Sequence, residues 1–302
     1  MVKISKFTGL KVRGEEMNII KHRRKYIFIS IAIILAGLIM FFVNGLNYGI
    51  DFTGGTLVQI KAGKFIPVEE IRKITDEFDK DASIVYGGTN KEDIIIRSTL
   101  DLSNEDTNRI ITSFESNLGI DRKNAQSEKF GAFMGKEIRN KAVTSILIAS
   151  VAMLIYITFR FEFKFGVAAI IALIHDVLVT IAIYAIFKLP VNSSFIAAIL
   201  TIVGYSINDT IVIFDRIREE RKLNPKESIE NVINGSITRT MRRTINTTVT
   251  TVLAVVVLYI VGVDDVKVLA LPLILGMIAG TYSSIFIAAP LWYDLTKIKT
   301  AK

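Results

Sequence analysis

An acidic residue, Asp209, lies in the later half of an apolar run that begins 14 residues earlier, at Phe195. At 1.5 Å per helical residue it lies about 21 Å along a segment long enough to cross a membrane. An ionised aspartate there costs at least about 2.5–3.5 kcal/mol on insertion scales, so it is seldom present for packing alone. Tyr205, Asn208 and Asp209 are offset by three and four residues and share one helical face. We expect this face to contact other helices rather than lipid, and Asp209 to take up and release protons.

A second polar face opens the apolar segment that starts near Ile245, again at three- and four-residue spacing: Arg243, Asn246, Thr247, Thr250 and Thr251. An ion pair between Asp209 and Arg243 would reduce the cost of keeping the carboxylate ionised. Protonation of Asp209 would weaken the pair and let the two helices move. Two alternatives stay open: the pair is static, or Arg243 only sets the topology.

His175 and Asp176 interrupt another apolar segment and supply a second protonatable group near the middle of the bilayer. A simple hydrogen bond from His175 to a backbone carbonyl is an equally good interpretation. Together, Asp209, Arg243, Asn208, Tyr205, Asp176 and His175 are the residues that we expect to form a proton pathway.

A glycine-rich stretch follows the first apolar segment and contains Gly49, Asp51, Gly54 and Gly55. Paired glycines allow backbone conformations closed to other residues and can direct N–H groups at an anion. We favour a tight exit turn with Asp51 as a local cap, and an anion site is the alternative.

These residues are carried by six apolar segments, each long enough for a membrane-spanning helix. The predicted spans are Tyr26–Val43, Ala142–Phe159, Phe165–Phe187, Phe195–Phe214, Ile245–Val263 and Val268–Leu291. The first lacks a small-x-small cleavage site after it, so we expect an uncleaved anchor rather than a signal peptide.

Basic residues collect before the first span, in the loop after the fourth span and in the tail, which by the positive-inside rule places both termini in the cytoplasm. The chain is then divided into five parts: a basic cytoplasmic N-terminus (1–25), the first helix (26–43), an extracytoplasmic α+β domain (44–140), five further helices (141–291) and a cytoplasmic tail (292–302).

The domain between the first two spans alternates short strands with amphipathic helices. Strands are predicted at Thr56–Lys61, Ser83–Tyr86, Asp93–Ser98 and Ala125–Phe130, and helices at Pro67–Phe78 and Leu102–Leu118. Ser103 and Asp106 have the spacing of a capping box. The sequence therefore predicts an α-helical membrane protein with a small α+β domain.

Composition narrows the function. The chain has 302 residues, of which 51% are hydrophobic, and no cysteine, so a membrane protein without disulfides or thiolate metal sites is expected. The net charge is +8, and the basic residues lie beside apolar segments, which favours a role in membrane topology over binding of nucleic acid. There is no phosphate-binding loop. We expect no enzyme activity, cofactor or metal, and energy from a partner or a gradient.

Four motifs, in order along nearly the whole chain, resemble the SecD/SecF family of protein-export membrane proteins. They are Gly49-Ile-Asp-Phe-Thr-Gly-Gly-Thr56, His175-Asp-Val177, the run from Gly204 to Glu219, and Asn234–Thr244 with Asn246-Thr-Thr248. The last two, like the small outer domain, are similar to the SecF branch. Each motif alone is weak, and the four in register are strong.

The resemblance implies a six-helix half of an RND-type transporter that pairs with SecD. It implies association with the SecYEG channel, with YajC and YidC as further candidates, and with translocating polypeptide in the cytoplasmic membrane of a prokaryote. It also implies that the proton-motive force drives export, with Asp209 and Arg243 in proton passage. Two alternatives remain: an RND-type exporter of a small molecule or lipid acting as an oligomer, and a scaffold with static polar residues.

Overall fold

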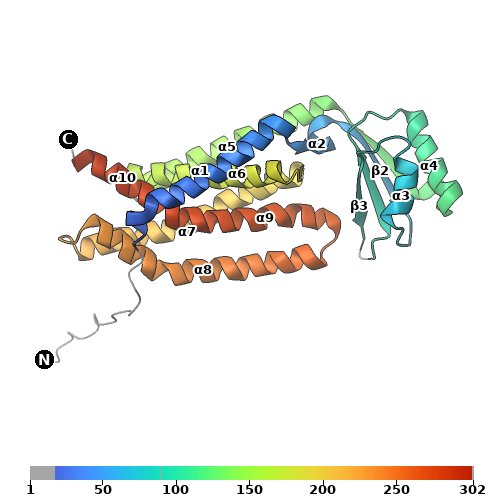
Figure 1. The fold of residues 1–302 in the computed structure, drawn as a ribbon. Coiled ribbons are helices and arrows are strands. Elements are labelled where there is room, and N and C mark those ends of the chain that lie inside the picture. Colours follow the sequence, from blue (N-terminus) through green and yellow to red (C-terminus); the bar gives the residue numbers. More distant parts are fainter. Residues whose placement is uncertain (1–17, 89, 301–302) are drawn as a thin grey trace.

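A computed structural model describes residues 18–88 and 90–300. The first 17 residues, and with them most of the predicted basic N-terminus, lie outside the described part of the chain. Long helices form a bundle with a small sheet domain at one end (Figure 1). The elements are α1 (Ile19–Asn44), β1 (Asn47–Tyr48), α2 (Ile50–Thr53), β2 (Gly55–Lys61), α3 (Val68–Thr75), β3 (Ser83–Gly87), β4 (Asp93–Ser98), α4 (Asn104–Leu118), the 3-10 turn Arg122–Asn124, β5 (Ala125–Phe130), α5 (Ala132–Arg160), α6 (Phe163–Ile186), β6 (Pro190–Val191), α7 (Ser193–Leu223), α8 (Ile229–Val261), α9 (Asp264–Ser283), the π-helical turn Ser284–Ala288 and α10 (Ala289–Thr300).

Six helical segments are long and apolar enough to cross a membrane, which confirms the predicted number. They are α1, α5 from Gly135, α6, α7, α8, and the continuous segment Val266–Lys297 that includes α9, the π-turn and α10. Several helices extend beyond the apolar runs because their polar ends continue to form backbone hydrogen bonds outside the apolar region.

The basic segment after the fourth span is helical rather than a long loop, which corrects the prediction. α7 continues to Leu223, and α8 begins at Ile229 after a short turn. The side chain of Arg216 bonds Glu220 one turn later at 2.5 Å, and Ser228 caps the next helix. Glu, Arg and Lys are good helix formers, so charge alone did not indicate a loop.

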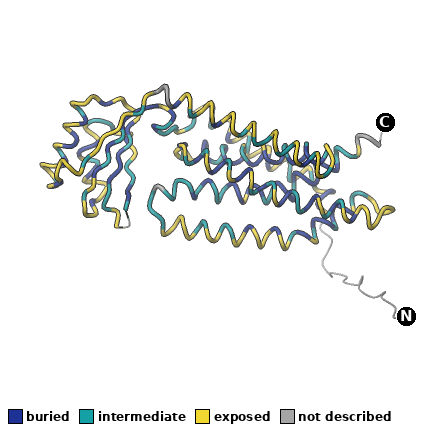
Figure 2. Tube along the Cα trace, turned by 180° about the vertical axis from the view of Figure 1, so that it is seen from behind, coloured by how far each residue is buried: buried dark blue, intermediate teal, exposed yellow. Residues whose placement is uncertain are grey.

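α6 and α9 are the most buried of the membrane-spanning segments, and buried residues lie along the middle of the bundle (Figure 2). α9 packs closely on α7 at Gly276 and Gly280, which form a G-x-x-x-G motif. A Cβ on Gly276 would lie 2.1 Å from Ile202 Cδ1, and one on Gly280 would lie 2.9 Å from Ser206 Oγ. The motif therefore serves close packing.

The α+β domain is an antiparallel sheet of order β3-β4-β2-β5, with α3 and α4 packed on it. All four predicted strands are confirmed, as is the capping box of Ser103 and Asp106 at the start of α4. The first helix of this domain, α3, is shorter than predicted: it ends at Thr75, and Pro67 is its N-cap. This domain lies between α1 and α5 in the chain and at one end of the bundle (Figure 1).

Candidate proton site in the membrane helices

Asp209 is buried inside the bundle, at 4% exposure, on α7. Thr248 of α8 donates its hydroxyl to Asp209 Oδ2 at 3.4 Å, and the same hydroxyl lies 2.6 Å from Thr281 Oγ1 of α9. A hydroxyl both donates and accepts, so these two threonines can exchange hydrogen-bond partners as the carboxylate changes its charge. Three helices therefore meet at one titratable group.

A second buried acid, Asp176 of α6, is fully enclosed. It accepts from Ser206 Oγ at 2.5 Å through one oxygen, and its other oxygen lies 3.0 Å from His175 Nδ1. The opposite ring nitrogen of His175 lies 2.8 Å from Ser30 Oγ of α1. The two predicted residues of the third span thus contact each other, and His175 bonds side chains rather than a backbone carbonyl.

The two acids are linked through α7, where Ser206 precedes Asp209 by three residues and so shares its helical face. Ser284 reinforces this link, since its hydroxyl lies 2.8 Å from Thr210 Oγ1 and donates to the Ser206 carbonyl at 3.4 Å. We call the set formed by Ser30, His175, Asp176, Ser206, Asp209, Thr210, Thr248, Thr281 and Ser284 the polar layer.

Apolar clusters lie on both sides of the polar layer. Along α7, Ile202 belongs to a cluster toward the outer domain, and Ile213 belongs to one at the other end of the bundle. Along α6, Tyr184 and Ala172 are divided in the same way. The buried carboxylates of the polar layer therefore lie between two apolar clusters.

The face of α8 that meets Asp209 differs by one residue from the predicted face. Thr240, Thr244 and Thr248 are buried, whereas Arg243 is exposed on the chain. Within residues 18–88 and 90–300, Asp209 and Arg243 form no ion pair, although the guanidinium lies within electrostatic range of the carboxylate. Packing against α7 and α9 sets the buried face of α8, and Arg243 is one residue outside it.

The other two predicted residues of α7 lie at the border of the site. Tyr205 is half-buried, and its hydroxyl is 3.5 Å from Thr251 Oγ1 of α8. Asn208 is exposed on the chain. The structure therefore brings His175, Asp176 and Asp209 into one layer and leaves Asn208 and Arg243 on the surface.

The glycine-rich stretch is bonded to the start of α7, and Asp51 does not form a local cap. Asp51 Oδ2 accepts from the backbone N–H and the hydroxyl of Ser193, at 2.8 and 2.6 Å, at the start of α7. This corrects the prediction of a local cap. Gly49 donates its N–H to the Val191 carbonyl at 2.8 Å beside the parallel pair β1–β6.

Gly54 and Gly55 follow with positive φ of 79° and 143°. A Cβ on Gly55 would lie 2.1 Å from the Ser98 carbonyl oxygen, so only glycine fits where the chain enters β2. These glycines shape the entry into the sheet domain.

Ser30, Thr248 and Thr281 belong to the polar layer but were not among the predicted site residues. Ser30 is the single serine in an otherwise apolar first span, which was a usable signal. Thr248 ends a four-residue repeat with Thr240 and Thr244, which marks one helical face. Nothing in the sequence distinguishes Thr281 from a threonine that only bonds its own helix.

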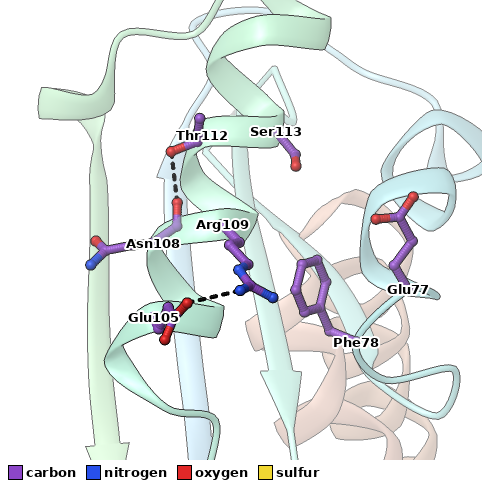
Figure 3. A pocket seen from close by; sticks show the side chains of 7 residues that line it. All are labelled: Glu77, Phe78, Glu105, Asn108, Arg109, Thr112 and Ser113. Carbon is purple, nitrogen blue, oxygen red and sulfur yellow. Dashed lines mark hydrogen bonds and ion pairs between the residues drawn. The ribbon is translucent and has the colours of Figure 1, made fainter.

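No group of three His, Asp or Glu side chains in the described ranges is arranged to hold a metal ion. The open groove of 810 Å³ in Figure 3 lies elsewhere, on the sheet domain between the end of α3 and α4. Its arginine, Arg109, bonds Glu105 at 2.8 Å, so the groove has no free cation of its own.

Family comparison agrees with the motifs. The family described as "Protein export membrane protein SecD/SecF, C-terminal" matches residues 110–298, and the "SecD/SecF GG Motif" matches residues 39–64. A protein translocase subunit SecF of Helicobacter pylori is 36% identical over 87% of this chain and 82% of its own. The SecF subunit of Calditerrivibrio nitroreducens is 35% identical over 98% of this chain and 99% of its own.

Solved structures agree with the fold. A crystal structure of a Thermus SecDF, described as a translocon-associated membrane protein, matches with a TM-score of 0.79 and 34% identity over 93% of this chain. A SecDF structure in a "super-membrane-facing form" matches with a TM-score of 0.70 and 33% identity. This chain spans 38% of the first of these longer chains.

These matches are to subunits of protein export and cover almost the whole chain, so they do not favour a small-molecule exporter. With its six spans and its inserted sheet domain, the chain is a multi-pass membrane protein that belongs to the SecD/SecF family of protein-export membrane proteins.

Proposed function

We propose that this chain is the SecF-type half of an accessory complex of the Sec translocase, in which protonation of Asp209 drives a change in helix packing that assists export. The observation that carries the proposal is a buried carboxylate that accepts from Thr248 of α8, which is itself hydrogen-bonded to Thr281 of α9, between two apolar clusters. Ionised groups inside membranes are costly and generally mark ion or proton pathways.

Protonation changes what Asp209 can bind. The ionised carboxylate accepts from Thr248 and attracts positive charge, and the neutral acid does so less strongly. Moving one charge through 100 mV is worth about 2.3 kcal/mol, which shifts a two-state packing equilibrium by more than about tenfold. His175 and Asp176 extend the pathway toward α1 and α6.

SecD is the proposed partner because α8 carries an exposed polar surface at membrane depth. Arg243, Asn246, Thr247 and Thr250 are all exposed on the chain, and we call them the exposed α8 stripe. The two threonines bond carbonyls of their own helix, but the arginine and the asparagine are costly toward lipid. A second six-helix half would cover the stripe and supply a counter-charge for Arg243.

The rest of the setting follows from the family and from charge. The termini, the end of α7 and the first half of α8 carry basic residues, which supports a cytoplasmic location for both termini and an outer location for the sheet domain. We place the complex in the cytoplasmic membrane beside SecYEG, with YajC and YidC as additional candidates, acting on translocating polypeptide.

The test is the variant Asp209→Asn, which keeps the size of the side chain and removes its titration. We expect export stimulated by the proton gradient to fall at least about tenfold, as for loss of a transported charge. Co-purification with SecD should persist. Glu219→Gln, an exposed carboxylate on the same helix, is the matched control and should leave export unchanged.

Normal gradient-stimulated export in Asp209→Asn vesicles would rule out the proton role. Loss of SecD from the purified variant would instead support a scaffold with static polar residues. Export that fails equally in the Glu219→Gln control would mean that the effect is not specific to the buried acid.

A further inference from the structure

A basic cleft lies at the end of the bundle opposite the sheet domain, between the α5–α6 turn and the end of α7. Its volume is 380 Å³, and its lining residues are Phe161, Glu162, Phe165, Arg218, Arg221 and Lys222. Arg221 and Lys222 follow Arg218 by three and four residues, so the three cations lie on one side of α7. Three positive side chains and one carboxylate, Glu162, leave the lining with a net charge of +2.

The cations of this cleft are only partly used by the protein. Arg218 donates to the carbonyl of Arg160 at 3.1 Å, and its guanidinium lies 5.8 Å from the centre of the Phe161 ring. Arg160 itself pairs with Asp215 at 3.9 Å. In the described ranges Arg221 and Lys222 are exposed and form no ion pair. Arg218 positions the turn, and two free cations remain at the mouth.

An apolar groove lies on the other side of the same turn. It has a volume of 400 Å³ and is lined by Leu154, Ile155, Thr158, Phe159 and Phe163. Phe159 is 94% exposed and Phe163 is 61% exposed on the chain, so the protein leaves both rings largely uncovered. Phe159 and Phe161 are two residues apart, so their Cα atoms lie within roughly 8 Å of each other.

We infer that the cleft and the groove together bind one anionic phospholipid, with the phosphate at Arg221 and Lys222 and an acyl chain against Phe159 and Phe163. Basic pockets between membrane helices bind the headgroups of anionic lipids through charge and hydrogen bonds. The positive-inside rule requires only that positive residues lie on the cytoplasmic side of the membrane. It does not require that they converge on one face beside two aromatic rings and an acyl-sized groove.

A free phosphate would fit the cations equally well. The apolar groove beside them is the observation that favours the lipid, because inorganic phosphate gains nothing from it. The site lies outside the polar layer and does not depend on the proposed proton function.

The test is native mass spectrometry of the full-length protein, titrated with phosphatidylglycerol or with phosphatidylcholine. We expect one phosphatidylglycerol to bind more tightly than phosphatidylcholine. The double variant Arg221→Gln/Lys222→Gln should weaken that first site about tenfold or more, since each cation near the surface contributes to binding. The control Lys226→Gln/Arg242→Gln removes the same charge from exposed positions outside the cleft and should leave the site unchanged.

Two further arms separate the lipid from other sources of binding. Phe163→Ser should also weaken the phosphatidylglycerol site while inorganic phosphate at millimolar concentration fails to compete. Equal affinity for both lipids, equal weakening by the two double variants, or competition by phosphate without an effect of Phe163→Ser would each overturn the inference. Unchanged thermal unfolding in phosphatidylcholine confirms that each variant is folded.

Discussion

Two serine–aspartate hydrogen bonds of the same length lie in different surroundings, one in the sheet domain and one in the helical bundle. In the sheet domain, Ser98 Oγ donates to Asp79 Oδ2 at 2.5 Å, and in the bundle Ser206 Oγ donates to Asp176 Oδ2 at 2.5 Å. Asp79 is half-buried, so water can solvate its free side, whereas Asp176 is fully enclosed. Water can therefore replace the serine hydroxyl as a donor to Asp79, but not as a donor to Asp176.

The difference extends to how each region is built. The core of the sheet domain consists of apolar side chains, with its charged groups at the rim. The bundle instead has apolar clusters toward both ends and places its acids in the polar layer between them. A soluble domain keeps its charge where solvent stabilises it. The bundle keeps charge where only neighbouring helices can stabilise it, so the charge responds to how those helices pack.

The largest expected effect comes from deleting each serine hydroxyl in turn. Ser206→Ala should reduce the free energy of local opening by about 1.5–3 kcal/mol, because it removes a hydrogen bond to a buried acid that water does not reach. Ser98→Ala should cost about 0.5–1 kcal/mol, because water replaces the donor at Asp79. Native-state hydrogen exchange of α7 and β4 amides measures both.

Equal losses in the two variants would break the comparison, since they would show that water enters the polar layer freely. A threonine at either position restores the hydroxyl and serves as the control, and it should recover most of the lost protection.

The sequence predicted structure well wherever the determinant is local. The capping box of Ser103 and Asp106 and the strand Ala125–Phe130 depend on neighbours within a few residues, and both are confirmed. The six spans follow from apolar length alone.

The sequence predicted contacts between distant residues less well, because such contacts depend on how the helices and strands pack in space. On α8, Thr248 is buried, whereas the neighbouring Thr247 is exposed. The periodicity of the sequence does not show which of these two residues faces α7 and α9, because the packing of those helices decides it. Asp51 bonds Ser193, 142 residues away, and Ser30 bonds His175, 145 residues away. A single sequence can mark a residue such as Ser30 as unusual, but it does not show which distant residue it contacts.

A smaller effect is expected where the two regions touch. Asp264, at the start of α9, accepts from the backbone N–H of Tyr86 on the edge strand β3 at 3.1 Å. Asp264→Ala should speed exchange of the Tyr86 amide about threefold to tenfold, as for loss of one hydrogen bond of ordinary strength. Asp264→Asn keeps an acceptor oxygen and should give an intermediate rate.

This contact should also depend on pH. Partial burial opposes ionisation of Asp264, but the bonds from Lys267 and from the Tyr86 N–H outweigh it and hold the pKa of Asp264 below its usual range. A lowered pKa stabilises the docked state above the usual value of about 3.9, and this stabilisation is lost as pH falls through the lower value. Protection of the Tyr86 amide that stays constant through that interval would contradict the role of the ionised carboxylate.

The smallest effect is expected at the capping box of α4, where the charge of Asp106 lies at the surface of the sheet domain. The hydroxyl of Ser103 donates to Asp106 Oδ2 at 2.7 Å and its backbone N–H donates at 3.2 Å, and these bonds lower the pKa of Asp106. The cap should therefore stabilise the helix above the usual aspartate pKa and lose that contribution as pH falls through the lowered value.

Asp106→Asn should flatten this acid dependence of exchange in the first turn of α4, while the membrane helices remain unchanged. The cap should titrate with the bulk solution because its half-buried carboxylate lies at the surface of the sheet domain, and its titration should follow the outer pH without delay. If amides around Ser206 and Asp209 followed the outer pH in the same immediate way, the apolar clusters would not seal the polar layer, and the contrast between the two regions would be lost.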